Sequence, residues 1–213
     1  MAILKYINPV NFMRKPHLVI SYCRFYTLYS LLIITCVPTK LNAEIHNYDI
    51  VQADHNAPIT EITAMVNAAY TKTLWLKPGV QRIQPSELAA MIQKPTKKLF
   101  LCLDNKTICG AVLLDLSSAP EMSMLAVHPK YQGQKIGTML MQHIERELVK
   151  LGHNYVLIYV VPFGQDQLVA YYLKAGYYFL DKTLPFTHLQ LVKQEYQDQV
   201  FLRIMRKDLK GEI

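Results

Sequence analysis

One continuous stretch, Met124 to Leu140, limits the folds open to this chain more than any other part of the sequence. It reads MLAVHPKYQGQKIGTML: the end of an apolar strand, a glycine-containing turn and the start of a helical pattern. Pro129 stops the strand because proline cannot donate to a β-ladder. Such a turn exposes successive backbone N–H groups at the positive end of a helix dipole, which suits a phosphate or a pyrophosphate. Gly133 and Gly137 would let the backbone approach that ligand closely.

Two familiar phosphate motifs are absent from the sequence. It contains no Gly-Lys-Ser/Thr of a P-loop, and no G-x-G-x-x-G follows the first expected strand. Neither a P-loop fold nor a dinucleotide-binding fold is therefore expected. On the residues alone, a plain strand-to-helix turn without a ligand explains the stretch equally well.

The rest of residues 44 to 213 predicts one α/β domain. Apolar runs predict strands, and apolar residues at a 3.6-residue spacing predict helices. The order β-α-α-β-β-β-α-β-α-β indicates a mixed central sheet with helices on both faces. The expected strands are 48–53, 98–103, 107–116, 122–127, 155–161 and 200–206, and the expected helices are one beginning at 58 and three at 86–92, 137–151 and 165–175.

Four positions carry sharper local expectations. Ser86 is expected to cap the second helix, and Gly152 to end the third. Asn105 and Lys106 predict a two-residue hairpin turn. The run 155–161 is apolar throughout, which is typical of a strand buried on both faces.

The net charge of +7 at first suggests a nucleic-acid partner, but the charge is unevenly distributed. Residues 1–43 hold five of the 23 basic side chains and none of the 16 carboxylates. Residues 44–213 therefore keep 18 basic and 16 acidic side chains and carry only +2. Such a balance is not the basic footprint of a nucleic-acid groove, so we expect no nucleic-acid partner.

The N-terminal segment, residues 1–43, needs a separate explanation. Its apolar run from Phe25 to Val37 follows a basic stretch, and Ala43 is a small residue where a signal peptide would be cleaved. The run is shorter than the roughly 18 residues of a membrane span. A signal peptide, a membrane anchor and a start site placed too far upstream remain open. Membrane contact is expected only through this segment.

The four cysteines do not form a disulfide framework. Cys102 and Cys109 would face each other across the expected hairpin, and the other two lie in the N-terminal segment. Two buried thiols in a reducing cytosol are favoured over a disulfide at the hairpin. No nearby histidine completes a zinc-binding spacing, so we expect no metal.

The stretch VHPKYQGQKIGT, residues 127–138, resembles the acyl-CoA-binding motif of the GNAT superfamily of N-acetyltransferases. Its matching positions are Val127, Pro129, Gln132 and Gly137. Lys135 replaces the middle glycine of the motif. A second stretch, YYLKAGY at residues 171–177, is similar to the end of the family's next helix. The resemblance extends over residues 48–209.

The resemblance implies acetyl-CoA as cosubstrate. It assigns the pyrophosphate to backbone N–H groups of the turn, and the pantetheine arm to the end of the preceding strand, paired like an added β-strand. The family often has an asparagine where Gln165 stands. The implied cofactor-binding positions are Leu125, Ala126, Val127, Gln132, Gly133, Gln134, Lys135, Ile136, Gly137, Thr138 and Gln165.

The resemblance also implies direct attack of an amine on the thioester, with a backbone N–H stabilising the oxyanion. Tyr172 would give a proton to the departing thiolate; packing of a helix tyrosine on the sheet is its alternative role. Glu121 is the candidate base, because a period-2 spacing would put it on the face of Leu125 and Val127. A solvated carboxylate at a strand end is the alternative for Glu121.

The expected function is transfer of the acetyl group of acetyl-CoA to a primary amine of a small-molecule acceptor. Trp75 and Arg82 fall where the family's acceptor pockets vary, although Trp75 also suits a core. Lys135 and Gln165 leave open a non-catalytic acyl-CoA-binding or sensing domain. We expect a cytoplasmic location, with a membrane-tethered or exported protein as the alternative, and leave a homodimer open.

Overall fold

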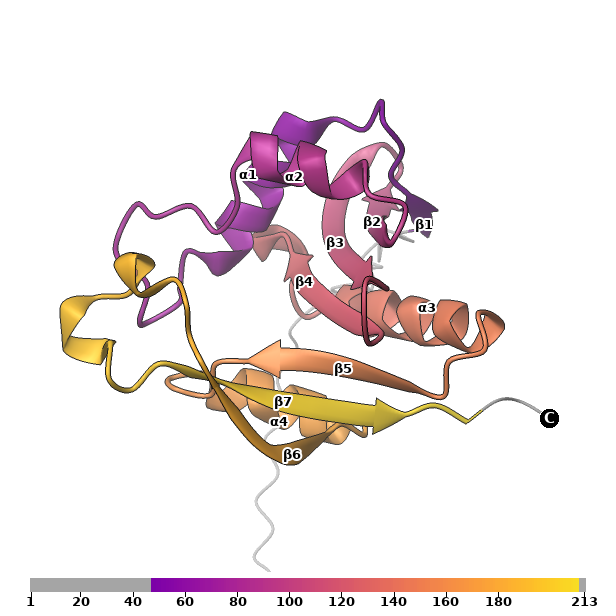
Figure 1. Cartoon of the computed structure of the whole chain (residues 1–213). Helices are drawn as coiled ribbons and strands as arrows, with labels where there is room; N and C mark the ends of the chain where they lie inside the picture. Colours follow the sequence, from indigo (N-terminus) through magenta and orange to yellow (C-terminus); the bar gives the residue numbers. More distant parts are fainter. Residues whose placement is uncertain (1–46, 211–213) are drawn as a thin grey trace, which may run out of the picture. The chain divides into compact units, whose positions relative to one another are not determined.

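A computed structural model describes residues 47–210 of the chain. These residues form a seven-stranded mixed sheet of order β1-β2-β3-β4-β5-β7-β6, together with four α-helices (Figure 1). The strands are β1 (Tyr48–Gln52), β2 (Lys97–Asp104), β3 (Thr107–Asp115), β4 (Glu121–Val127), β5 (Tyr155–Val160), β6 (Tyr178–Pro185) and β7 (Phe201–Asp208). The helices are α1 (Ile59–Tyr70), α2 (Pro85–Ile92), α3 (Ile136–Lys150) and α4 (Asp166–Lys174). The predicted α/β fold with a mixed central sheet is confirmed.

Helices cover both faces of the sheet, as the sequence predicts. On one face, α1 and α2 pack Ile62, Val66 and Leu88 against β2, β3 and β4. On the other face, α3 and α4 share a second core cluster with the sheet, to which they contribute residues such as Leu140 and Tyr172. Strand alternation separates these two clusters, because successive side chains of a strand point to opposite faces.

The N-terminal segment, residues 1–43, for which a signal peptide, an anchor and a misplaced start site were all left open, lies outside the described residues. Within residues 47–210, no helix combines the length and the apolar character that crossing a membrane requires.

Several local expectations are confirmed. Asn105 adopts a φ of 57° in the turn between β2 and β3, and Gly152 has a φ of 83° just after α3. Cys102 and Cys109 are free and buried. The Cys109 thiol lies 3.0 Å from the Cys102 carbonyl oxygen, to which it donates.

Three expectations are wrong. The strand β6 was not expected. Its exposed Asp181 and Lys182 interrupt the apolar pattern of a strand that, among residues 47–210, pairs with β7 alone at the edge of the sheet. Helix α2 is capped by Gln84, not by Ser86, and Glu87 completes a capping box with Gln84. Strand β5 alternates between buried and half-buried side chains, so only one of its faces is fully covered.

A bulge interrupts β4 in its middle. Pairing with β3 skips from Ser123 to Ala126, so that Met124 and Leu125 together oppose one residue. Met124 has a φ of 52°. The bulge also exchanges the faces of the strand: Met122 packs on the α3 side, whereas Met124 and Ala126 pack on the α1 side.

The parallel strands β4 and β5 pair only where they begin. Glu121 is in register with Leu157, and the Leu157 N–H donates to the Pro120 carbonyl at 2.9 Å. Beyond this point the strands diverge toward their carboxyl ends (Figure 1). In the part of the chain that the structure describes, the β5-facing edge of β4 therefore has no ladder partner from Ser123 to Val127.

Candidate active site

The turn after β4 is held to the end of that strand by side chains. His128 Nδ1 accepts a hydrogen bond from the Lys130 backbone N–H at 3.2 Å, so this imidazole serves the turn itself. The Gln132 amide reaches back, and its Nε2 donates to the Val127 carbonyl at 3.3 Å. Residues 132–135 are exposed, whereas Ile136 is buried in the core. The turn is thus an exposed loop fixed at both of its ends.

Two residues of this loop have a left-handed backbone. Gly133 has a φ of 84°, and a Cβ built there would meet nothing within 4 Å. Lys135 precedes α3 with a φ of 64° and a ψ of 8°. Only glycine adopts this region freely, and other residues incur a cost of about 1–2 kcal/mol. The left-handed backbone therefore explains why the motif has a glycine at this position, and Lys135 adopts the same conformation with some strain.

The N-terminus of α3 suits an anion. No side chain caps the helix, so its first backbone N–H groups remain directed at the exposed loop. The Tyr48 hydroxyl of β1 donates to the Gln134 side chain and fixes the far side of the loop. The arrangement provides main-chain donors with open space in front of them, which fits the pyrophosphate of a nucleotide-containing cosubstrate.

Helix α4 lies close to the start of α3. A Cβ built on Gly137 would come within 3.0 Å of the Tyr171 hydroxyl and 3.7 Å of a Val127 methyl. The Tyr171 hydroxyl also lies 3.2 Å from Thr138 Oγ1. The absence of a side chain at position 137 is therefore what lets the tyrosine of α4, the end of β4 and the start of α3 meet.

Tyr172 faces the core beneath this junction and is only 7% exposed. Its ring packs 5.6 Å from that of Tyr171 and 5.7 Å from that of Tyr177, between ring centroids. Burial raises the pKa of the Tyr172 phenol far above its ordinary value, and the neighbouring Tyr70 and Tyr171 hydroxyls raise it further. The phenol is therefore protonated at neutral pH and can act as a hydrogen-bond donor.

Tyr70, the last residue of α1, reaches the unpaired end of β4 from the opposite face. Its hydroxyl donates to the Leu125 carbonyl at 3.3 Å. The Arg82 guanidinium lies over its ring, 5.6 Å from the centroid. Burial raises the pKa of Tyr70 and Arg82 lowers it, with burial the larger effect. Tyr70 thus joins the end of β4 to the loop that follows α1.

Glu121 lies at the paired beginning of β4, and the spacing argument that put it on the face of Leu125 and Val127 is wrong. The bulge inserts one residue between them, so Glu121 points to the α1 side while Leu125 and Val127 pack on the α3 side. Glu121 neighbours Asp115, with which it is in register. Burial, and then repulsion by Asp115, raise the pKa of its carboxyl group.

The structure separates the remaining candidates. Gln165 is half-buried at the start of α4 and makes no side-chain capping bond. Trp75 is 8% exposed and belongs to a core cluster with Phe186, whose ring lies 5.2 Å away. Its core role is confirmed. Leu125, Val127 and the loop 132–138 lie together, whereas Glu121 lies at the other end of β4.

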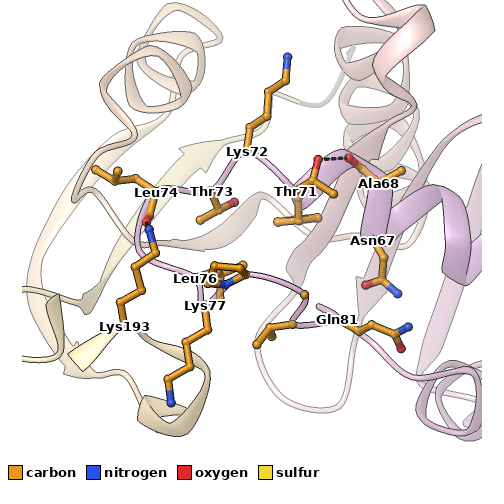
Figure 2. A pocket seen from close by; sticks show the side chains of 14 residues that line it. Asn67, Ala68, Thr71, Lys72, Thr73, Leu74, Leu76, Lys77, Gln81 and Lys193 are labelled. Atoms are coloured by element: carbon orange, nitrogen blue, oxygen red, sulfur yellow. Dashed lines mark hydrogen bonds between the residues drawn. The ribbon is translucent and has the colours of Figure 1, made fainter. Parts of the chain in front are cut away.

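A cleft of about 590 Å³ lies beside Tyr70 (Figure 2). The end of α1, the α1–α2 loop and Lys193 of the β6–β7 loop form its walls. The two loops bond to each other: the Lys77 N–H donates to the Leu191 carbonyl, and the Lys193 N–H to the Trp75 carbonyl, each at 3.0 Å.

Sequence reasoning missed Tyr70 and the lysines of this cleft. The Tyr70 hydroxyl bonds to a residue 55 positions away, and Lys193 lies more than a hundred positions beyond the α1–α2 loop. No local motif relates such positions. The helical period that ends at Tyr70 is the only sequence signal for its role.

Comparisons with known proteins place the fold. A model of the acetyltransferase (GNAT) domain matches residues 66–197. The ribosomal-protein-S18-alanine N-acetyltransferase of Escherichia coli superposes with a TM-score of 0.60 at 17% identity, over 78% of this chain and 97% of that one. The yncA protein of Salmonella typhimurium, solved with its cofactor acetyl-CoA, superposes with a TM-score of 0.59 at 17% identity, over 78% of this chain and 96% of that one. None of the curated proteins matches the chain.

The domain match covers the open edge of β4, the loop before α3, and α4 with its tyrosines. It spans more than half of the 213 residues. The similar yncA protein was solved with acetyl-CoA as its cofactor, and the exposed main-chain donors described above suit the phosphates of such a molecule. On this evidence the chain belongs to the GNAT family of acetyltransferases.

Proposed function

We propose that the protein moves the acetyl group of acetyl-CoA to a primary amine of a small acceptor by direct attack on the thioester. The observation that carries the proposal is the unpaired end of β4, which lies between the loop before α3 and the two tyrosines Tyr70 and Tyr172. An extended pantetheine arm can pair with this edge as a short added strand.

Each part of the site has a proposed role. Backbone N–H groups of the loop 132–138 would hold the pyrophosphate, with Gln165 close to the start of α4 as a further polar contact. Backbone groups of Leu125, Ala126 and Val127 would hold the pantetheine arm. The bulge frees main-chain groups at Met124 from the β3 ladder, and a free N–H there would stabilise the oxyanion that develops on the carbonyl.

Tyr172 is the proposed donor to the departing sulfur. Its raised pKa keeps the phenol protonated, so it can donate a hydrogen bond as negative charge builds on the sulfur. Complete proton transfer to a thiolate of ordinary pKa, about 8.5, would be uphill from such a phenol. The proton lost by the amine has to reach solvent or a base, and the half-buried Glu121 at the beginning of β4 is the proposed base, reached through intervening water.

The decisive experiment replaces Tyr172 with Phe. Turnover of a responsive amine, followed as release of free CoA, should fall by roughly 10²–10⁴-fold. Calorimetric affinity for acetyl-CoA should change by no more than about twofold, a change worth well under 1 kcal/mol. Tyr178→Phe, at an exposed position of β6, is the matched control and should leave both quantities unchanged.

A non-catalytic acyl-CoA sensor is the second candidate, favoured by the strained Lys135 in the loop. Firm acetyl-CoA binding without CoA release from any amine of a broad panel would select the sensor. Equal turnover by the Tyr172→Phe variant would leave the transferase standing but remove Tyr172 from its mechanism.

We also propose that the domain works in the cytoplasm, where acetyl-CoA is supplied. The support is chemical, because an exported enzyme would lack this cosubstrate. N-terminal sequencing of the native protein and fractionation of cells test the proposal. Recovery of a processed chain in the exported fraction would overturn it.

A further inference from the structure

The cleft beside Tyr70 has the size of a small-molecule site. Its volume of about 590 Å³ lies within the roughly 300–1,000 Å³ typical of such sites. Tyr70 lines the cleft, while its hydroxyl bonds to Leu125 at the open end of β4. Tyr70 also raises the pKa of the neighbouring Tyr172. One side chain therefore connects the cleft with the place where the thioester would lie.

The charges of the cleft have one sign. Lys72, Lys77 and Lys193 line it, and its lining includes no aspartate or glutamate. None of the ion pairs found within residues 47–210 involves any of these three lysines. Arg82 adds a fourth cation over the ring of Tyr70.

Two of the lysines are held in place by carbonyl groups. Lys77 Nζ donates to the Gln190 carbonyl at 2.8 Å, and Lys193 Nζ donates to the Leu74 carbonyl at 2.7 Å. A carbonyl orients an ammonium group without cancelling its charge, and each ammonium keeps two further donors. Figure 2 shows Lys72 directed away from Lys77 and Lys193, whose ammonium groups lie at the contact between the two loops, one bonded to Gln190 and the other to Leu74.

The excess of cations distinguishes this cleft from a second one. A second cleft, of about 320 Å³ beside β1, is lined by Asp54 and Glu61 as well as Lys106. Residues 44–213 as a whole carry only +2. The concentration of positive charge therefore does not follow from the composition of the domain.

We infer that the acceptor is an amine that also carries an acidic group, a carboxylate or a phosphate, which is drawn to Lys77 and Lys193. This inference rests on the proposed amine acetylation. A cleft of one sign attracts ligands of the other sign and repels its own. An acceptor amine is itself cationic before it reacts, so a polyamine or a basic peptide would enter against the field. An acceptor with an acid at one end and the amine at the other has its charges matched to the cleft.

Matched pairs of amines test the inference with the full-length protein. The pairs are an amino acid against its amide and phosphoethanolamine against ethanolamine, with putrescine as the dication. Each acidic member should have a kcat/KM about ten- to hundredfold higher than its neutral partner, the range of one or two charge-assisted contacts. The preference should shrink as salt is added. The pair with the larger ratio of acidic to neutral kcat/KM shows whether the site prefers a carboxylate or a phosphate.

A double variant, Lys77→Gln with Lys193→Gln, locates the effect. Glutamine keeps a donor for each carbonyl, and thermal unfolding checks that the loops still fold. The ratio of kcat/KM for the acidic amine to kcat/KM for its neutral partner should fall toward one. The change should come from KM, and the affinity for acetyl-CoA should stay unchanged. Lys106→Gln in the second cleft is the matched control and should keep the ratio.

The outcomes separate the two claims. If neutral amines or putrescine are acetylated as well as the acidic amines, the acceptor inference is overturned while the transferase stands. An acidic preference that survives the double variant also overturns it, because the lysines would not be its cause. If no amine of any class releases CoA although acetyl-CoA binds, the transferase fails and takes the acceptor inference with it.

Discussion

Lys135 holds a left-handed backbone position directly before α3, where glycine would be unstrained. Lys135→Gly removes the strain but loosens the unfolded chain, so we expect a stability change within about 1 kcal/mol. Both Lys135→Gly and Lys135→Ala remove an ammonium group beside the proposed phosphate site. Each should weaken acetyl-CoA binding several-fold at low salt and less at high salt. If calorimetry finds an unchanged affinity for acetyl-CoA in both variants, the Lys135 ammonium group does not contribute to binding.

Glu121 has a carboxyl pKa raised by burial and by Asp115. A raised acid pKa gives stability below the ordinary Glu pKa that is lost as pH rises through the folded value. Glu121→Gln should therefore raise the melting temperature at pH 7, and the gain should vanish below about pH 4. The exposed Glu195→Gln serves as control. A lower melting temperature at pH 7 would contradict the prediction.

At the level of residues, the sequence predicts what local motifs encode and misses what distant contacts decide. Gln132, Gly133 and Gly137 could be named because one short pattern contains them all. The face of Glu121 could not, because a bulge inserts one residue and reverses the alternation from which the face was read. The role of Tyr70, at the end of helix α1, depends on a partner in strand β4 that lies 55 positions along the chain.

At the level of elements, α3 is pressed directly onto β3. A Cβ on Gly110 would come within 2.9 Å of an Ile136 methyl and 3.2 Å of the Ala126 carbonyl oxygen. Gly110→Ala should therefore destabilise the protein by about 1–3 kcal/mol, the usual cost of overpacking. Chemical denaturation measures the change, and Thr107→Ala at the exposed start of the same strand is the control. Unchanged stability would mean that α3 can shift at no cost.

The contact between α3 and α4 gives a second prediction for elements. Gly137→Ala would place a methyl 3.0 Å from the Tyr171 hydroxyl, and should weaken acetyl-CoA binding by displacing the start of α3. Tyr171→Phe removes that hydroxyl, so the double variant should bind better than the sum of the two single effects predicts. Calorimetry on all four proteins completes the cycle. Strict additivity would argue against the contact.

Long apolar elements were predictable, because periodicity and glycine punctuation agree along them. Helix α3 and strands β2 to β5 appear within one or two residues of their expected bounds. The edge strand β6 was not predictable, because much of it is exposed and its polar residues hide the alternation. Its existence follows from pairing with β7, which no local window contains.

At the level of the whole molecule, binding of the cosubstrate should stabilise the folded protein. Acetyl-CoA at a hundred times its Kd should add about 2.7 kcal/mol to the stability. For a domain of this size, that raises the melting temperature by roughly 5–10 °C. Differential scanning fluorimetry checks this, with acetyl-thiocholine, which lacks the nucleotide, as the negative control. A shift with the control alone would point to the acyl group rather than the loop.

The two loops that line the cleft beside Tyr70 are hydrogen-bonded to each other. Lys77 bonds across to Gln190, Lys193 bonds back to Leu74, and Leu76 forms a bridge with Val192. If this cleft takes the acceptor, the substrate range cannot change through one loop alone, because residues of each loop hold the other loop in place. Anyone grafting a new specificity onto this scaffold should transplant residues 71–81 and 188–193 together, as a single cassette.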